Sequence, residues 1–294
     1  MLQHLNLVPT APARVVVVGA GGFVGNAIAG RLERDGIPVL RLARRDVDLL
    51  AADAARRLAA ILRDDDVLIA VAAIAPCRTP EMLRDNVALA VALVRAAARP
   101  LAQVVNIGSD AVYGDGPVPL TEDSPTAPGT LHGVMHLARE TMFRGEILAP
   151  LCLLRPSLLY GAADPHDGYG PNRFRRLANR REAIVLFGAG EERRDHVFID
   201  DLAAVAARIV LRRSTGVLNV ATGAVASFAD IAGMVNRLAG SEIPIAATPR
   251  RGPMPHNGYR PFDIAACRAA FPDFAYTSLA DGLAQAQRDV ARTP

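Results

Sequence analysis

The sequence predicts an α/β fold in which a doubly wound parallel sheet carries a smaller C-terminal lobe. Three observations favour this fold. Short, continuously apolar runs alternate with segments whose apolar residues recur at helical spacing. A turn rich in glycine follows the first apolar run directly. Hydrophobic residues make up 51% of the 294 residues, which is enough for a core larger than that of a small domain.

The first half of the chain supplies the alternation. Residues 14–18, four valines after Arg14, are a β-branched run that predicts a strand, and residues 23–35 place apolar side chains at helical spacing. The same two patterns predict strands at 38–42, 66–72, 103–107 and 151–155, and helices at 50–63, 81–98 and 132–147. Strands that are apolar throughout are typical of a parallel sheet with helices on both faces.

The second half of the chain predicts shorter elements. Residues 161–172 are rich in Gly, Pro and Asp, and short apolar runs follow at 184–187, 217–220 and 243–245. Ser227 and Asp230 have the spacing of a capping box that begins a helix. We expect residues 1–160 to form the sheet domain, with parts of 185–225 returning to it. Residues 161–294 would then form mainly a substrate-binding lobe.

The glycine turn after the first strand is the strongest functional signal. Gly19, Gly22 and Gly25 form a GxxGxxG pattern at the start of a helix. Main-chain N–H groups at a helix N-terminus attract phosphate, and the missing side chains let a pyrophosphate come close. This order of strand, turn and helix is typical of a Rossmann-type dinucleotide-binding fold. We expect a nicotinamide dinucleotide here; the alternative is a tight turn without a ligand.

The end of the second strand indicates which nicotinamide cofactor is preferred. Proteins that prefer NAD usually carry an acidic residue there, which bonds the ribose 2′-hydroxyl. Ala43 takes that place here, and Arg44 and Arg45 follow it. Because guanidinium groups suit a 2′-phosphate, the pattern favours NADP. If the two arginines are ordinary surface charges, NAD serves equally well.

Charge and cysteine content argue against several other classes of protein. A net charge of +3 without a basic tail gives little reason to expect nucleic-acid binding. Three widely spaced cysteines suit neither a disulfide framework nor a tetrahedral zinc site, and a reducing cytoplasm is the simplest location. No apolar run reaches the roughly 18 residues that a membrane span needs. We expect a cytoplasmic protein with neither a membrane nor a nucleic-acid partner.

Further motifs follow the glycine turn in order. They are Asp48-Leu49, residues 66–73, residues 107–114, the LRPSLLYG segment at 154–161, residues 170–174 and residues 187–201. Together they resemble the extended short-chain dehydrogenase/reductase family of NAD(P)-dependent sugar-nucleotide epimerases, dehydratases and reductases. The resemblance spans nearly the whole chain. It implies a nucleoside-diphosphate sugar as substrate and a structural asparagine at Asn86.

The resemblance also implies roles for individual residues. The cofactor would be held by Gly19, Gly22, Phe23, Val24, Gly25, Arg44, Arg45, Asp48, Leu49, Ala72, Ala73, Ile107, Pro156 and Ser157. The substrate would be held by Asp110, Tyr113, Asn172, Phe174, Arg194 and Arg260. Arg194 would contact the phosphates of the substrate, and Ser109 stands at the position of the family's catalytic Ser or Thr.

The family's catalytic Tyr-x-x-x-Lys pair is replaced in this chain. His132 and His136 stand at the two positions, and Gly133 and Glu140 keep the flanking pattern. A four-residue spacing keeps both histidines on one helix face. In one interpretation both are catalytic. Protonated His132 would donate to a developing alkoxide, Ser109 would polarise the carbonyl, and His136 would donate to the ribose.

Other interpretations of the two histidines stay open. The proton would come instead from Tyr113, Tyr160, Asp110 or a water. Imidazoles four residues apart are also a known zinc pairing, but no third ligand is evident, so we expect no metal. In the last interpretation catalysis has been lost, and the chain is a cofactor-binding module.

Among the active interpretations, the resemblance favours redox chemistry on a nucleoside-diphosphate sugar, most simply the reduction of a keto-sugar. The short chain and the expected NADP preference favour net reduction, and the lack of a Glu after Asp110 argues against dehydration. The alternatives are a ketoreductase for a non-sugar natural-product ketone and an inactive NAD(P)-binding module. Members of the family often dimerise, so we expect a homodimer. Val87, Val91 and Val94 would suit its interface unless they face the sheet.

Overall fold

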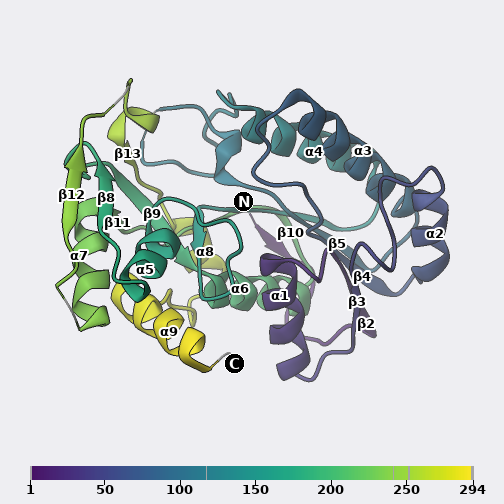
Figure 1. Cartoon of the computed structure of the whole chain (residues 1–294). Coiled ribbons are helices and arrows are strands. Elements are labelled where there is room, and N and C mark those ends of the chain that lie inside the picture. Colours follow the sequence, from purple (N-terminus) through teal and green to yellow (C-terminus); the bar gives the residue numbers. More distant parts are fainter. Residues whose placement is uncertain (1, 117, 241, 251, 293–294) are drawn as a thin grey trace.

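The computed structural model of the chain describes residues 2–116, 118–240, 242–250 and 252–292, and its central feature is a seven-stranded sheet (Figure 1). The strand order is β1-β10-β6-β5-β4-β2-β3. Six strands run parallel, and β1 pairs antiparallel with β10 at one edge. These strands are β1 (Gln3–His4), β2 (Arg14–Val18), β3 (Val39–Leu42), β4 (Asp66–Ala70), β5 (Gln103–Ile107), β6 (Leu151–Pro156) and β10 (Ser214–Val220). The expected Rossmann-type sheet is confirmed.

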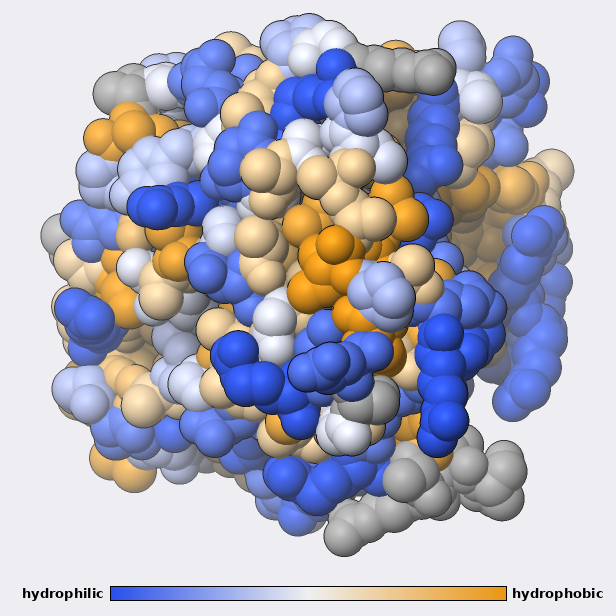
Figure 2. Space-filling view, turned by 60° about the vertical axis from the view of Figure 1, so that its left-hand side comes forward, coloured by the Kyte–Doolittle hydropathy of each residue, from blue (hydrophilic) through white to orange (hydrophobic). Residues whose placement is uncertain are grey.

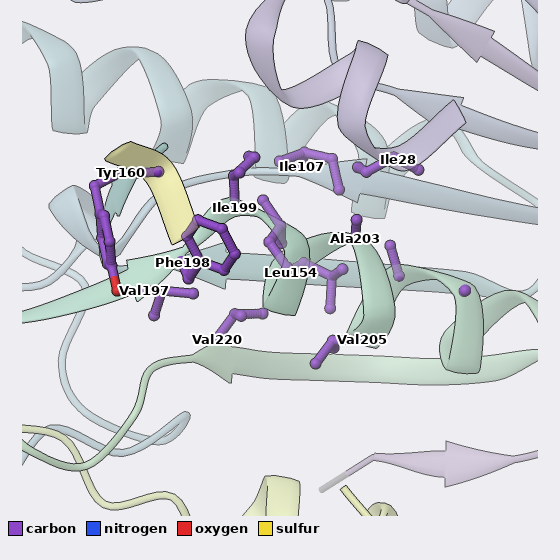
Figure 3. Close-up of a cluster of buried hydrophobic side chains, with 14 of the residues drawn as sticks. Ile28, Ile107, Leu154, Tyr160, Val197, Phe198, Ile199, Ala203, Val205 and Val220 are labelled. Atoms are coloured by element: carbon purple, nitrogen blue, oxygen red, sulfur yellow. The ribbon is translucent and has the colours of Figure 1, made fainter. Parts of the chain in front are cut away.

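Helices cover both faces of this sheet. One face carries α1 (Phe23–Arg34) and α6 (Ile199–Leu211), and the other carries α2 (Ala54–Ile61), α3 (Pro80–Ala96) and α4 (Leu131–Glu146). Successive side chains of a strand point to opposite faces. Val15 and Val17 therefore join the hydrophobic cluster under α1 and α6, and Val16 and Val18 join the other cluster. Figure 3 shows part of the first cluster, where side chains from the sheet, α1 and α6 meet.

The strand β10 joins the sheet from late in the chain. After β6 the chain enters the smaller lobe, and it returns through α6 before it forms β10. β10 then pairs in parallel with β6, with Gly216 opposite Cys152 and Val220 opposite Pro156. The residues that form the last parallel strand of the sheet therefore come late in the chain, after a large part of the smaller lobe.

The smaller lobe lies beside the sheet domain and contains short elements (Figure 1). They are β7 (Leu158–Tyr160), α5 (Pro171–Asn179), β8 (Ile184–Phe187), β9 (Arg193–Phe198), β11 (Val225–Ser227), α7 (Phe228–Ala239), β12 (Ile245–Thr248), β13 (Tyr259–Arg260), α8 (Ala265–Ala270) and α9 (Leu279–Arg292). The predicted capping box is confirmed, because Ser227 and Asp230 exchange hydrogen bonds at the start of α7. Figure 2 turns this lobe toward the viewer and shows hydrophobic residues among hydrophilic ones.

Several predicted strand bounds differ from the structure, among them those of β4 and β12. β4 ends at Ala70, because its partner β2 ends opposite it at Val18, whose carbonyl accepts from the N–H groups of residues 71 and 72. The strand expected at 243–245 lies at Ile245–Thr248, where it pairs in parallel with β8 from Ile184 to Phe187, and Ile243 is buried before this strand begins. In the described ranges, no helix has both the length and the apolar character that crossing a membrane requires.

Candidate active site

A cleft of about 1210 Å³ opens at the carboxyl ends of the parallel strands. Its walls include the residues that follow β2, β3, β4, β5 and β6. The chain order reverses at this place, since β3 lies on one side of β2 and β4 on the other. Ligands of open α/β sheets bind in such a crevice. The volume exceeds the roughly 300–1,000 Å³ of an ordinary small-molecule pocket, which leaves room for a dinucleotide and a second ligand.

The glycine turn forms the wall of the cleft that fits a pyrophosphate. A Cβ on Gly19 would lie 2.6 Å from the Ala72 nitrogen, and Gly19 has a φ of +97°, which favours glycine. A Cβ on Gly25 would lie 2.2 Å from the Gly19 carbonyl oxygen, so α1 reaches the turn only without a side chain there. α1 begins after Gly22 with no capping side chain and no acidic residue in its first turn. Its positive end is therefore free to hold a phosphate.

All of the residues expected at the cofactor line this cleft. They are Gly19, Gly22, Phe23, Val24, Gly25, Arg44, Arg45, Asp48, Leu49, Ala72, Ala73, Ile107, Pro156 and Ser157. Asn86 has the structural role that the resemblance implies. Its Oδ1 accepts from the Ile74 N–H at 2.8 Å, and its Nδ2 donates to the Ile74 carbonyl at 2.9 Å. It thereby fixes the loop that continues the wall after β4.

The rim of the cleft beyond β3 is basic. Ala43 follows β3, and the side chains of Arg44 and Arg45 are 77% and 89% exposed. Arg44 makes a 3.4 Å contact to Asp48, and Arg45 a 3.9 Å contact to Asp46. Because exposed ion pairs of this kind contribute little, both guanidinium groups are available to an anionic ligand.

The segment after β5 carries Ser109 to the cleft. Ser109 caps the short 3₁₀ helix η1 (Asp110–Val112), and its hydroxyl accepts from the Ala111 N–H at 3.1 Å. The same hydroxyl lies 3.4 Å from a carboxylate oxygen of Asp110, to which it donates. α4 comes close to this segment because Gly133 has no side chain; a Cβ there would lie 2.1 Å from the Ala111 carbonyl oxygen. Ser109 and His132 consequently line the same cleft.

The rings of His132 and His136 lie next to each other, with centroids 4.7 Å apart and planes at 86°. The Cys77 N–H donates to Nδ1 of His132 at 3.4 Å, so the neutral ring carries its proton on Nε2. Burial lowers the pKa of His132, and the charge of Asp110 opposes this shift. Burial, with the positive charges nearby, lowers the pKa of His136 well below its ordinary value. Both rings are therefore neutral at pH 7.

Neither tyrosine that the sequence offered as a proton donor lines the cleft. The hydroxyl of Tyr113 donates to Asn219 at 2.7 Å and accepts from Arg155 at 2.8 Å, and burial raises its pKa. The hydroxyl of Tyr160 is buried without a partner, and burial raises its pKa also. Asp110, in contrast, is in the cleft wall. Of the proton donors that the sequence offered, His132 and Asp110 therefore line the cleft together with Ser109.

The residues expected at the substrate divide into two groups. Asp110, Asn172 and Arg194 line the cleft, whereas Tyr113, Phe174 and Arg260 are buried away from it. Phe174 packs in the core of the smaller lobe, with its ring 5.1 Å from that of Tyr169, a residue of the cleft wall. The Tyr113 hydroxyl donates to the buried Asn219, and the Arg260 guanidinium donates to the carbonyl of Asp110, the residue after Ser109. In place of the expected substrate contacts, these three side chains support the wall of the cleft.

Five of the six histidines line the cleft, whereas the sequence predicts only His132 and His136 there. His166, His196 and His256 join His132 and His136 from separate parts of the smaller lobe. Nδ1 of His196 bonds to the Arg194 carbonyl at 3.2 Å, Nε2 is buried without a partner, and burial lowers the pKa of the ring to about 3. Among the described residues, no group of three or more His, Cys, Asp or Glu side chains has an arrangement suited to a metal ion.

The sequence of this chain is similar to those of sugar-nucleotide enzymes. Residues 15–221 match the sequence model of the NAD dependent epimerase/dehydratase family. The dTDP-6-deoxy-L-talose 4-dehydrogenase (NAD(P)(+)) of Kitasatospora kifunensis is 28% identical over 289 residues, which cover 88% of this chain and 90% of that protein. The dTDP-4-dehydro-6-deoxy-D-allose reductase of Streptomyces bikiniensis is 27% identical over 289 residues, which cover 81% of this chain and 84% of that protein.

Solved structures share the fold. MoeE5 in complex with UDP-glucose and NAD superposes with a TM-score of 0.81 at 25% identity, over 95% of this chain and 99% of that chain. The UDP-glucose 4-epimerase of Thermotoga maritima with UDP-glucose superposes with a TM-score of 0.81 at 19% identity, over the same shares of the two chains. The second likeness concerns the fold alone.

Proposed function

Because this chain belongs to the NAD-dependent epimerase/dehydratase family, we propose that it is an NAD(P)-dependent oxidoreductase that reduces the keto group of a nucleoside-diphosphate sugar. One observation carries the proposal: the glycine turn, Ser109 with His132, and Arg194 all line a single cleft. Hydride transfer to a ketone that carries phosphate groups requires a site for an anionic dinucleotide, a polar pair at the carbonyl, and a cation that holds the phosphates of the ketone. The two relatives named above act on dTDP-sugars, which supports this substrate class.

The polar pair beside η1 would act on the carbonyl. When bound, the nicotinamide supplies the hydride. The Ser109 hydroxyl polarises the carbonyl oxygen, and protonated His132 donates the proton that the new alkoxide needs. The carboxylate of Asp110 favours the protonated state of His132 and so opposes the effect of burial. His136 lines the cleft in its neutral state, so it is suited to hydrogen-bond a ribose hydroxyl without carrying charge.

The smaller lobe would hold the diphosphate. The side chain of Arg194 is 12% exposed at the cleft and contacts Glu192 at 3.2 Å. A guanidinium that is already largely desolvated binds a diphosphate more strongly than an exposed one does. Asn172 accepts from the Gly161 N–H and donates to Asp164, so its part is to shape the loop next to the substrate.

We propose NADP as the preferred cofactor. Ala43 leaves space beside the end of β3, where a carboxylate would repel a 2′-phosphate. Arg44 and Arg45 lie on the same rim with only weak ion-pair contacts of their own. Both observations favour a 2′-phosphate over a bare 2′-hydroxyl, although NAD also fits the glycine turn.

A cytoplasmic homodimer is the form that we propose for this enzyme. On α3, Val94 is buried against the sheet, but Val87 and Val91 are only half-buried. The half-buried pair leaves apolar surface next to α4, which suits a helical interface. Gel filtration with light scattering tests this proposal, and a monomer at micromolar concentration contradicts it.

Binding and turnover measurements on the purified chain test the proposed reaction. A thermal-shift panel of UDP, dTDP, GDP and CDP should find one nucleotide that stabilises the chain. The matching keto-sugar nucleotide should then support NADPH oxidation, with Ser109→Ala lowering kcat and Arg194→Met raising KM. Indifference to all four nucleotides contradicts a sugar-nucleotide substrate and favours a non-sugar ketone. Tight NADPH binding without turnover of any ketone contradicts catalysis altogether.

A further inference from the structure

A third polar side chain lies on the same helix face as the two histidines. His132, His136 and Arg139 occur at i, i+4 and i+7 along α4, so they form one stripe. His132 is half-buried at the cleft, His136 is 6% exposed, and Arg139 is 2% exposed. The stripe therefore leads from the cleft into the protein, and Arg139 lies at its buried end.

The guanidinium of Arg139 holds the ends of two strands. It donates to the carbonyls of Ala70 at 2.8 Å and Ala72 at 2.5 Å, where β4 leaves the sheet. It also donates to Oδ1 of Asn106 on β5 at 2.5 Å. Ala72 is part of the cleft wall, and its nitrogen is the atom that a Cβ on Gly19 would meet. One side chain of α4 thus fixes the main chain next to the glycine turn.

No anion compensates the charge of Arg139. Its hydrogen-bond acceptors are neutral, and it pairs with none of the carboxylates in the described part of the chain. Arg155, also buried, pairs with Glu140 at 2.7 Å. Burial lowers the pKa of Arg139 to about 10, which still leaves it charged at pH 7. Because an unpaired buried charge is strongly destabilising, a neutral donor would hold the same carbonyls at a lower cost.

We propose that Arg139 is a positioning residue of the reaction proposed above: it fixes the Ala72 main chain at the cofactor site and places a permanent positive charge behind His136. The inference rests on the proposed function only in so far as it names a reaction. Both effects of Arg139 act on the cofactor cleft, whichever second ligand binds there. A fixed charge there makes the floor of the cleft more favourable for an anionic dinucleotide.

The charge of Arg139 acts most directly on His136, which lies one helical turn away. Besides burial, His132 and Arg139 are the groups that lower the pKa of His136. From the other elements that pack here, Asp110 of η1 and His166 act on His132, and Glu140 is committed to Arg155. Removal of the Arg139 charge should therefore allow His136 to take up a proton more easily, and removal of a hydrogen bond alone should not.

Two variants separate the charge of Arg139 from its packing. Arg139→Gln removes the charge and keeps a donor, whereas Arg139→Lys keeps the charge. With the imidazole resonances of the full chain followed by NMR, His136 should titrate about one pH unit higher in the Gln variant and at the wild-type pH in the Lys variant. NADPH, measured by calorimetry, should bind about tenfold more weakly in the Gln variant alone.

Arg175 provides a matched control. It is 3% exposed, and within the described ranges its hydrogen-bond acceptors are main-chain carbonyls, those of Gly161, Ala162 and Ala286. Arg175→Gln also removes a buried guanidinium and keeps a donor, but it should leave the titration of His136 in place. A His136 titration that moves equally in both Gln variants would mean that general loosening is the cause, and would overturn the proposal.

The remaining outcomes also decide the question. An Arg139→Gln variant that folds and titrates like the wild type overturns the proposal. If that variant does not fold, the Lys variant decides: wild-type titration and NADPH affinity support a role for the charge, and a shift in either overturns it. Both readouts precede turnover, so a chain that binds NADPH but reduces no sugar nucleotide would sink the proposed function and leave this inference standing.

Discussion

The Arg260 guanidinium donates to the Asp110 carboxylate at 3.1 Å and to the Asp110 carbonyl at 2.8 Å. One residue belongs to β13 of the smaller lobe, and the other begins η1 directly after Ser109. Both side chains are almost completely buried, at 2% and 9% exposure. The smaller lobe therefore holds the segment that carries Ser109, and residues of both lobes line the cleft.

Arg260→Met tests this connection between the lobes. The change leaves the Asp110 carboxylate buried without its partner, so we expect a loss of about 3–5 kcal/mol in the free energy of unfolding. Chemical denaturation measures it. Arg208→Met is the control, because Arg208 pairs with Asp273 at the surface, where about 0–1 kcal/mol is at stake. Equal losses in the two variants would show that the buried pair does not hold the lobes.

The closeness of the glycine turn to α1 predicts a steric effect on cofactor binding. Gly25→Ala places a Cβ 2.2 Å from a main-chain oxygen, so the turn must shift. NADPH affinity, measured by calorimetry, should fall at least about tenfold. Gly145→Ala, on α4, has nothing within 4 Å of its Cβ and should instead gain about 0.5–1 kcal/mol of stability. Unchanged NADPH affinity in Gly25→Ala would rule out this turn as the pyrophosphate site.

The basic rim predicts a difference between the two nicotinamide cofactors. In the double variant Arg44→Gln, Arg45→Gln, NADPH should bind about tenfold to a hundredfold more weakly, because charge-assisted hydrogen bonds of about 1.5–3 kcal/mol are lost. NADH affinity should not change. Arg56→Gln is the control, since Arg56 is 81% exposed on α2 and pairs with Asp53. Parallel losses for both cofactors would argue against 2′-phosphate recognition.

The environment of His132 predicts the direction of the pH dependence. Burial lowers the pKa of His132, so the protonated donor is present only toward acidic pH. The rate of NADPH oxidation should fall as the pH rises, with a midpoint below the ordinary histidine value of about 6.5. In Asp110→Asn the midpoint should move to lower pH, because the carboxylate that raises the pKa of His132 is gone. A rate that is flat from about pH 5.5 to 9 eliminates His132 as the proton donor.

The buried ring of His196 predicts a loss of stability in acid. Its pKa is about 3 in the folded chain and about 6.5 in the unfolded chain, so the unfolded chain binds more protons between these values. The contribution of His196 to the free energy of unfolding is fully present above about pH 6.5. It decreases as the pH falls, by about 2 kcal/mol at pH 5. His196→Phe should remove this part of the change in unfolding free energy with pH, which urea denaturation at several pH values measures. A variant with the wild-type slope would show that His196 is not kept neutral by burial.

Some elements could be predicted closely because local pattern and tertiary structure agree in them. The four valines at 15–18 are all apolar, and the sheet buries them on both faces, so β2, which begins at Arg14, has the predicted bounds. The glycine turn is equally legible, since close main-chain contacts at Gly19 and Gly25 exclude other residues. The contact of Gly25 with Gly19 lies within one turn, so the spacing of the glycines indicates it directly.

Other features depend on contacts between distant segments, which spacing does not reveal. Ser109 and Tyr113 lie in one motif, yet η1 turns the first toward the cleft and the second toward Asn219. In the sequence Arg139 does not differ from an ordinary helix residue, and only the structure shows that it bonds to β4 and β5. The three further histidines, His166, His196 and His256, reach the cleft from separate segments of the smaller lobe, so no spacing in the sequence predicts that they meet.

The late arrival of β10 has a consequence for how the molecule is made. A ribosome must translate as far as Val220 before β6 can pair with β10, its second neighbour. The β6 edge of the sheet therefore stays unpaired during synthesis of much of the smaller lobe. A recombinant fragment that stops at residue 160 keeps that side open permanently. Exposed main-chain groups along such an edge are a template for other chains, so the fragment should self-associate.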